Sequence, residues 1–273
     1  MKRPLAYSTK YIDNELKRLR SYLENAGQGT GPDLKETLYQ RLDQRIAAQD
    51  DGWIVNSLHD LFFYYAGGGD SHMYLDVDTA AAKESYHMAA SIGVLCYEMI
   101  EKGVPHHVLD SGYPFDHKKH NFNFARAPIL ANEYEMALKI TGTDTVEGAL
   151  LLRDDRLACA LLPESPEDPS INEDEIRQCM WAIAHGEGEL FNKYLEKRIK
   201  MLRRYGRLDQ TLFDGWGAAL VKLARQREIE CRLDVIELPC HLLDDSRIDA
   251  SRVVFPWAGQ IRAIIQKSGA PAG

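Results

Sequence analysis

Residues 213–229, Phe-Asp-Gly-Trp-Gly-Ala-Ala-Leu-Val-Lys-Leu-Ala-Arg-Gln-Arg-Glu-Ile, and residues 235–243, Val-Ile-Glu-Leu-Pro-Cys-His-Leu-Leu, are the most informative part of this chain. The first stretch predicts a helix entered through Gly215-Trp-Gly217, because Trp216, Ala219, Leu220 and Leu223 follow helical spacing. The second predicts a short extended run and a last turn that starts at Pro239. Neither stretch contains a nucleophile motif, a metal-ligand cluster or a phosphate-binding loop, so both indicate packing rather than chemistry.

Apolar residues repeat at helical spacing in several other segments of the chain. The segment 51–65 is predicted to be a helix that stops at Gly67-Gly-Gly69. Asp78 is predicted to cap a long helix that ends at Gly103. The remaining stripes favour helices packed on a common core; they are Ile12, Leu16, Leu19 and Leu23; Leu34, Leu38, Leu42 and Ile46; Met88, Ile92, Leu95 and Met99; and Phe191, Leu195, Ile199 and Leu202.

The middle of the chain interrupts this regularity. Residues 104–128 contain three prolines and no clear period, so a long irregular segment is expected there. Helix is expected to resume over 129–140. The run Asp144-Thr-Val-Glu147 is typical of a capping box, which would open a helix that continues to Pro163. Three prolines within 163–170 make that segment the expected linker.

The fold class follows from these patterns. Only Cys231-Arg-Leu-Asp-Val235 alternates as a β-strand does, and it is short. The sequence therefore predicts an all-α fold, an antiparallel helical bundle or helical-hairpin array with little or no β-structure. We expect one domain spanning 1–273, and a break between subdomains would fall at the Pro-rich linker 163–170.

Charge and cysteine usage restrict the classes of partner and compartment. The chain has 33 Lys and Arg against 41 Asp and Glu, a net charge of −8. This balance disfavours direct binding to nucleic acid and suits a basic protein partner. The acidic run 164–175 and the basic run 193–207 are interpreted as solvated surfaces. The five cysteines lack CxxC spacing, no secretion signal opens the chain, and no apolar run approaches about 18 residues, so we expect a cytoplasmic protein without a membrane partner.

Four histidines, His106, His107, His117 and His120, could bind a transition metal. The last two would share a helix face if their segment were helical. However, two lysines lie between them, no cysteine is close by and HExxH spacing is absent. Surface or packing histidines are therefore favoured, and no metal is predicted. A metal-dependent enzyme built on these four residues is the alternative.

No catalytic residue and no cofactor are predicted, so we expect that the protein is not an enzyme. The carboxylate doublets Asp76/Asp78, Asp154/Asp155 and Asp244/Asp245 are interpreted as helix caps or solvated positions, because close neighbours on a helix rarely face one site. The triplet Gly67-Gly-Gly69 has neither the preceding strand nor the following GK[ST] of a phosphate loop.

An interaction surface is expected in the acidic and aromatic segments between residues 70 and 124. Aromatic anchors ringed by carboxylates would suit a basic protein partner. The aromatic run Phe62-Phe-Tyr-Tyr65 cannot all face one core, since successive side chains fan around a helix. The residues expected to contact the partner are Asp70, Asp76, Asp78, Asp110, Tyr113, Phe115 and Asp116.

Two C-terminal patterns carry a family resemblance. In Ala182-Ile-Ala-His-Gly-Glu-Gly-Glu-Leu-Phe191, a small-residue helix turns through Gly-Glu before a Phe. In 213–243, an aromatic-containing helix ends in Leu-Ala-x-x-x-x-Ile and is followed by Glu-Leu-Pro-x-x-Leu-Leu. Together they resemble the immunity protein 49 family of bacterial polymorphic-toxin systems. The match covers mainly the C-terminal third, and the rest of the chain agrees only in its helical character and similar length.

The resemblance implies a cytoplasmic, all-α immunity protein that binds and neutralises a cognate toxin effector, for example a nuclease delivered by type VI secretion. It assigns no catalytic residue and no toxin-contacting position. A helical scaffold or adaptor similar to TPR proteins is the alternative, and it would bind unrelated peptides in a groove.

Overall fold

The structure is a computed structural model that describes residues 34–104, 117–204, 213–233, 235 and 237–268. These residues form an all-α array, so the predicted fold class is confirmed. Within these ranges no β-strand occurs, and one antiparallel bridge joins Val235 and Leu238. The described residues of the alternating run 231–235 form no strand, in line with the predicted lack of β-structure. No helix in the described ranges is long and apolar enough to cross a membrane.

Eleven α-helices make up the described part of the chain. A five-residue π-helix, η1 (His72–Asp76), joins the second and third of them, and two short 3₁₀-helices, η4 (Cys240–Leu242) and η5 (Ala250–Arg252), precede the last. The α-helices are α2 (Leu34–Ala47), α3 (Asp51–Ser71), α4 (Thr79–Glu101), α5 (His117–Leu130), α6 (Tyr134–Thr141), α7 (Val146–Leu152), α8 (Asp155–Leu161), α9 (Glu175–Ala184), α10 (Gly188–Arg204), α11 (Gly215–Arg225) and α12 (Ala258–Ser268).

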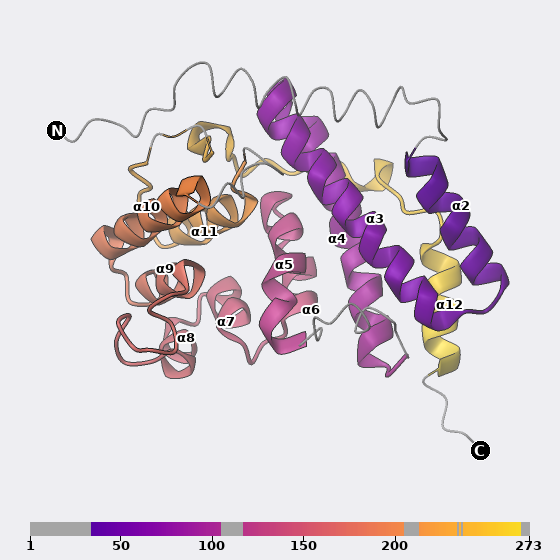
Figure 1. The fold of residues 1–273 in the computed structure, drawn as a ribbon, viewed down its shortest axis with the longest axis horizontal. Helices are drawn as coiled ribbons and strands as arrows, with labels where there is room; N and C mark the ends of the chain where they lie inside the picture. The colour runs from indigo at the N-terminus through magenta and orange to yellow at the C-terminus, as the bar shows by residue number, and fades with distance from the viewer. Residues whose placement is uncertain (1–33, 105–116, 205–212, 234, 236, 269–273) are drawn as a thin grey trace.

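The long helices α3 and α4 pack along each other and divide the described fold (Figure 1). On one side lie α2 and α12. On the other side lie α5 and α6 and then the group α7 to α11, in which α9 packs against α10 and α11 (Figure 1). The core runs through all of these elements, with Phe62 and Tyr86 in its central part and Phe191 and Phe213 in the α7–α11 part, each fully or almost fully buried.

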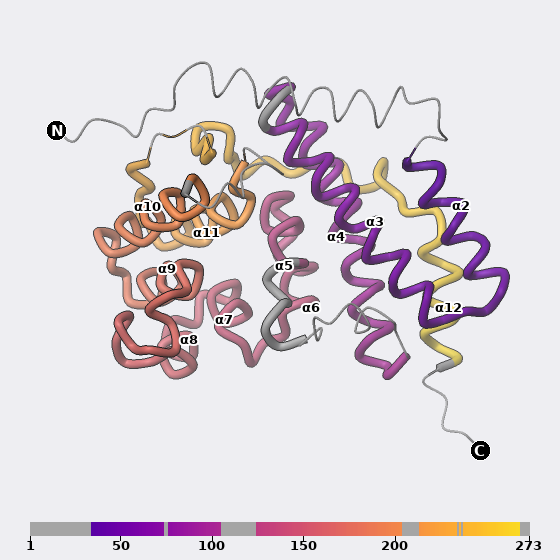
Figure 2. The backbone as a smooth tube through the Cα atoms, viewed as in Figure 1, coloured from indigo at the N-terminus to yellow at the C-terminus, as the bar shows by residue number. Residues whose placement is uncertain are grey.

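The C-terminal segment connects the two ends of the molecule. After α11 the chain runs back across the other helices to α12, so that α12 lies close to α2 (Figure 2). Trp257 closes this contact: its ring centroid lies 4.5 Å from that of Tyr39, and its indole N–H donates to Asp43. Elements from opposite ends of the described chain thus form one packed unit.

The expected stop at Gly67-Gly-Gly69 was wrong, because α3 continues through the triplet to Ser71. A Cβ at position 69 would lie 2.5 Å from the ring of Tyr86, so glycine allows α3 and α4 to approach closely. The expected cap of α4 is confirmed: the Asp78 carboxylate accepts from the amides of Ala80 (3.1 Å) and Ala81 (3.0 Å).

Two helix boundaries in the middle of the chain also differ from expectation. Part of the irregular segment 104–128 is helical, since α5 covers 117–130 with Pro128 inside it. The single helix expected over 129–140 is the end of α5 followed by α6. The helix expected to continue to Pro163 is broken at Arg153, which is left-handed with φ 59°, and Asp154 then caps α8 through the amide of Leu157 (3.0 Å).

The Pro-rich segment 163–170 lies against α9. Trp181 Nε1 donates to the carbonyl of Pro163 (2.9 Å), and Gln178 Nε2 donates to that of Pro166 (2.9 Å). Asp174 caps α9: its carboxylate accepts from the amides of Ile176 and Arg177 (both 3.0 Å). The single domain and the break at 163–170 stay predictions.

Two buried ion pairs meet where α11 begins. Arg198 on α10 donates to Asp214 through Nε (2.7 Å) and Nη2 (2.6 Å), and both side chains are buried. On the other side, Asp70 accepts from Arg126 (3.2 Å) and from the hydroxyl of Tyr86. A Cβ on Gly215 would lie 2.7 Å from Arg126 Nη1 and 3.3 Å from Asp70 Oδ1, so the backbone of α11 itself packs on this pair.

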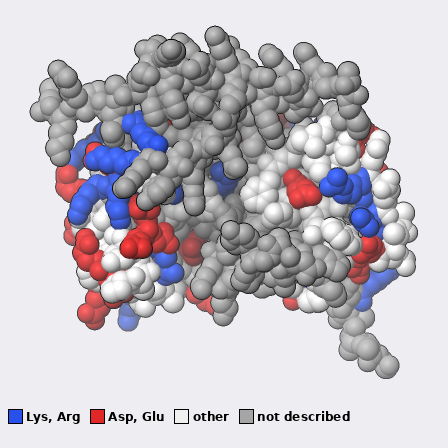
Figure 3. Space-filling view, viewed as in Figure 1, with Lys and Arg blue, Asp and Glu red and all other residues white. Residues whose placement is uncertain are grey.

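The basic run 193–207 is only partly the solvated surface that the sequence indicated. Arg198 is buried on Asp214, and Arg203 forms a two-point ion pair with the fully buried Glu237 (2.6 and 2.8 Å). Lys193 and Lys200 are exposed on the same helix. Figure 3 shows Lys, Arg, Asp and Glu side chains intermixed over the end of the molecule that carries α8 to α10.

Removing the carboxylate of Asp214 tests how much the fold depends on the buried pair. Asp214→Ala leaves the Arg198 charge buried without its partner, so we expect a loss of about 3–5 kcal/mol in the free energy of unfolding by denaturant titration. The matched control is Glu196→Ala, which removes an exposed i,i+4 pair with Lys200 on the same helix, and about 0.3–0.5 kcal/mol is expected there. Equal losses for the two variants would contradict the structural role of the buried pair.

Candidate functional site

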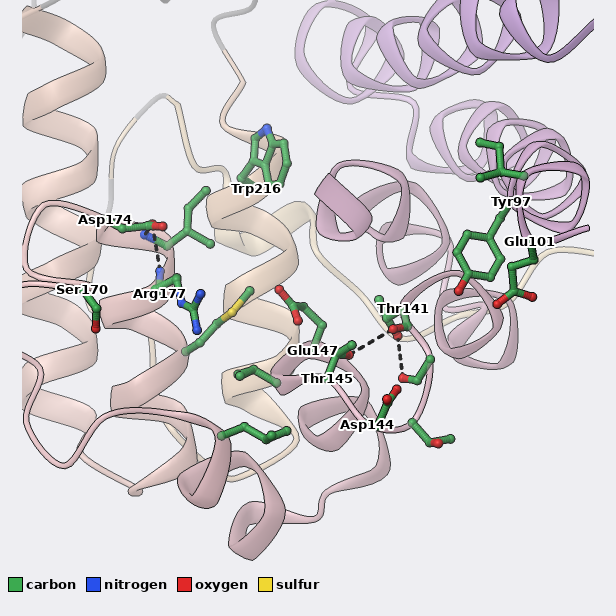
Figure 4. A pocket seen from close by; sticks show the side chains of 17 residues that line it. Tyr97, Glu101, Thr141, Asp144, Thr145, Glu147, Ser170, Asp174, Arg177 and Trp216 are labelled. Carbon is green, nitrogen blue, oxygen red and sulfur yellow. Dashed lines mark hydrogen bonds between the residues drawn. The ribbon is translucent and has the colours of Figure 1, made fainter. Parts of the chain in front are cut away.

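A cavity of ≈ 970 Å³ lies between α4, the turn before α7, and α9, with Trp216 of α11 at one edge (Figure 4). Its wall combines apolar side chains, among them Ile176 and Met180, with several ionisable ones. Cavities that take ligands commonly measure about 300–1,000 Å³ and combine an apolar lining with a few polar groups. By volume and lining this cavity is the candidate functional site.

The start of α7 determines which side chain lies in the middle of the cavity wall. Thr145 is the N-cap: its hydroxyl accepts from the amide of Gly148 (3.0 Å) and donates to the carbonyl of Thr141 (3.1 Å). The expected capping box began one residue earlier and would have used Glu147 to close the cap. Because the cap is Thr145, the Glu147 carboxylate instead lies in the cavity between α9 and the Thr145 turn (Figure 4).

Glu147 is held in an environment that disfavours its charge. Burial raises the pKa of its carboxyl group above the usual range, and the nearby carboxylate of Asp174 acts in the same direction. Its own backbone amide and the guanidinium of Arg177 oppose that rise without cancelling it. Glu147 forms no ion pair with any residue in the described ranges. A partly desolvated carboxylate that forms no ion pair is suited to bind a cation.

The other charges around the cavity are also mostly negative. Glu101, Asp144, Glu147 and Asp174 line it, and Arg177 is the one basic side chain among the described lining residues. Tyr97 stands beside Glu101, and burial, followed by its hydrogen bond with Glu101, raises the pKa of the Tyr97 hydroxyl to about 12. The arrangement can therefore bind a protonated amine or a guanidinium whose aliphatic part packs on the apolar wall.

The residues predicted to contact a partner lie elsewhere or outside the described ranges. Asp76 is exposed and forms a hydrogen bond with the His72 ring (Nδ1–Oδ2 2.9 Å), and Asp78 is exposed as the cap of α4. Asp78 and Glu101 stand at opposite ends of the 23-residue α4, about 35 Å apart at 1.5 Å per residue. Asp110, Tyr113, Phe115 and Asp116 lie outside the described residues.

The prediction that Asp70 contributes to an exposed rim was wrong. Its side chain is buried against Arg126 and Tyr86. Burial raises the pKa of this carboxyl group, while Arg126 and Tyr86 act against the rise. In the sequence Asp70 is only a carboxylate that follows a glycine triplet. This pattern does not show whether Asp70 is exposed or is a buried partner of Arg126.

The candidate metal ligands cannot be placed as a cluster. His106 and His107 lie outside the described residues, and His117 and His120 lie on α5 in a part whose side chains are outside them as well. Among the described side chains, no group of three or more His, Cys, Asp or Glu residues is arranged to hold a metal ion. The four-histidine alternative stays a hypothesis.

Comparisons with known proteins add no assignment. A scan against protein-family models, a search of curated proteins and a search of solved structures found no match to this chain. The resemblance to the immunity protein 49 family stays an expectation from the sequence.

The raised pKa of Glu147 gives a pH-dependent prediction for stability. A proton binds Glu147 more tightly in the folded chain than in the unfolded one, so stability falls as pH rises from about 4.3, the unfolded value, through the folded pKa. Glu147→Gln removes this penalty. We expect its Tm to exceed that of the wild type by about 1–2 °C at pH 7 and to equal it near pH 4, measured by thermal denaturation.

The control for this measurement is Glu135→Gln, which changes an exposed carboxylate on α6 and should leave Tm unchanged at both pH values. A lower Tm for Glu147→Gln at pH 7 would mean that the carboxylate is stabilising, and the description of the cavity as a desolvated acidic site would fail.

Proposed function

We propose that this protein is a non-enzymatic immunity protein that binds and neutralises a cognate toxin effector, and that its acidic cavity receives a basic side chain of the toxin. The observation that carries the proposal is the Glu147 carboxylate, partly buried in a ≈ 970 Å³ cavity without an ion-pair partner in the described chain. The sequence resemblance over 182–191 and 213–243 and the net charge of −8 support the same conclusion.

The cavity is suited to an arginine or lysine at the tip of a toxin loop. Its volume is at the upper end of the range for ligand sites, so it accommodates several side chains rather than one small ion. A guanidinium can donate two parallel hydrogen bonds to the Glu147 carboxylate, and this contact strengthens as water is excluded. The apolar wall of Ile176, Met180 and Trp216 would contact the aliphatic part of the same residue.

Neutralisation demands a tight complex that forms quickly. Protection from a few toxin molecules requires a Kd near 1 nM, which corresponds to about −12 kcal/mol. One buried contact cannot supply this alone, so the cavity would be the anchor within a larger interface. The negative charge of the protein would raise the association rate with a cationic toxin at low ionic strength.

Co-expression with the product of the adjacent reading frame tests the function itself. We expect cells that produce this neighbouring protein alone to stop growing, and cells that also produce the present chain to survive. The two proteins should co-purify as a complex. Normal growth without the present chain, or no complex at micromolar concentrations of both proteins, would contradict the proposal.

Replacing Glu147 tests the cavity as the anchor of that complex. Glu147→Lys places a cation where the toxin side chain would bind, so we expect Kd for the neighbouring protein to rise at least about 100-fold, while Glu147→Gln raises it about 10-fold. The matched control is Glu135→Lys, the same change at an exposed position of α6, with an expected effect below about 2-fold. If the position 147 variants are as well folded and bind as tightly as the control, toxin contacts lie outside the cavity.

A further inference from the structure

Two cysteines meet in the C-terminal segment after α11. The Sγ atoms of Cys231 and Cys240 lie 3.4 Å apart, and the Cys240 thiol donates to the sulfur of Cys231. Both side chains are partly exposed. Neither residue belongs to the acidic cavity, and their spacing, which is not CxxC, does not predict a pair.

The surroundings of Cys231 favour its thiolate. The hydrogen bond from Cys240 lowers the pKa of Cys231 to about 7; burial opposes this, and the backbone of Leu233 and the positive charge of Arg225 add to it. Arg225 is fixed nearby, because its Nη2 donates to the carbonyl of Cys240 (2.8 Å). The thiolate is the form of cysteine that reacts with oxidants.

The pKa values of the other three thiols are raised, unlike that of Cys231. Burial raises the pKa of Cys96 to about 12 and raises the pKa of Cys179 as well, and both side chains are buried. Cys159 is partly exposed like Cys231, but burial and the nearby Asp155 raise its pKa. Its sulfur has the ring of His185 (3.8 Å) and the carbonyl of Ala184 (3.5 Å) as neighbours, and no second cysteine. Cys159 is therefore a matched control for reactivity.

We propose that Cys231 and Cys240 form a peroxide-reactive pair that closes to a disulfide. In the first step the Cys231 thiolate attacks one oxygen of hydrogen peroxide or an organic hydroperoxide, the O–O bond breaks, and the leaving oxygen takes up a proton as water or an alcohol. In the second step the sulfur of Cys240 attacks the sulfenic acid of Cys231, the S–O bond breaks, and a second water leaves. The two thiols are oxidised by two electrons in total, and one peroxide is reduced.

The geometry requires only a small movement. A disulfide has S–S near 2.05 Å, so the two sulfurs must approach by about 1.4 Å from their present 3.4 Å. The backbone already turns back between them: the amide of Leu238 donates to the carbonyl of Val235 (3.1 Å), and the amide of Cys240 donates to that of Leu238 (2.8 Å). Rotation of the two side chains can therefore supply the approach.

A disulfide between Cys231 and Cys240 would restrict the segment 231–240, which contacts the start of α11. Glu237 lies between the two cysteines; its buried carboxylate pairs with Arg203, and its carbonyl accepts from the amide of Asp214 (2.8 Å). A disulfide across 231–240 would restrict this segment in the unfolded chain and leave its native contacts in place. Oxidation would thus stabilise the fold rather than disrupt it.

The test is oxidation of the full chain with one equivalent of hydrogen peroxide at pH 7, followed by alkylation and peptide mass mapping. We expect a linked pair of peptides containing Cys231 and Cys240, with a mass two hydrogens below that of the reduced pair, while Cys159 stays alkylated. The oxidised protein should gain about 5 °C in Tm, and dithiothreitol should reverse the gain.

Matched variants decide whether the pair is the cause. Cys231→Ser and Cys240→Ser should each lose the linkage and the Tm gain, and Cys159→Ser should keep both. The Tm of each variant in its reduced state, together with its circular dichroism spectrum, establishes that the variant folds. Sulfinic acid at Cys231 without a link to Cys240, oxidation of Cys159 at an equal rate, or an oxidised wild type with unchanged Tm would each overturn the proposal.

Discussion

The burial of four charges at the start of α11 is the constraint on which the rest of the described fold depends. Asp214 with Arg198, and Asp70 with Arg126, bring α3, α5, α10 and α11 to one place. Separating either pair would leave a charge in the core, which costs several kcal/mol. The pairs therefore fix the direction in which α11 leaves this point, and with it the position of Trp216 at the edge of the cavity (Figure 4).

In the C-terminal segment around residues 244–246, polar side chains donate the hydrogen bonds to backbone carbonyls that a neighbouring strand would donate in a sheet. Backbone carbonyls in an extended run must find donors, and here lysines and an amide supply them. Lys222 donates to the carbonyl of Asp244 (2.7 Å), Lys83 donates to that of Ser246 (2.9 Å), and Asn132 donates to the same carbonyl (2.7 Å). Desolvation lowers the pKa of Lys222, as expected for a lysine buried in such a role. The segment thus passes α11 and α4 without forming a strand.

Helical periodicity predicted most of the fold because it reports which face of a helix is buried. Leu38, Ile92 and Leu195 are in the core as their spacing indicated. Local signals predicted the ends of helices less well. At Gly67-Gly-Gly69 close contact between α3 and α4 overrides a breaker, and at Arg153 a left-handed residue divides an apolar stripe that has no glycine at that point. The site was not predictable, since a cap shifted by one residue turns Glu147 from a backbone partner into a cavity residue.

The acidic character of the cavity follows from the same buried pairs that hold α11. The net charge gives the excess of carboxylates over basic side chains, but the packing of the fold determines which carboxylates stay unpaired. Arg198 is committed to Asp214, and Lys197 on the same helix is committed to the carbonyl of Asn172 (2.8 Å) and to Gln178 (3.1 Å). Of the bases near α9, Arg177 is the one that lines the cavity. Because these cations are engaged elsewhere, Glu147 has no ion-pair partner among the described residues and can accept a cation from outside.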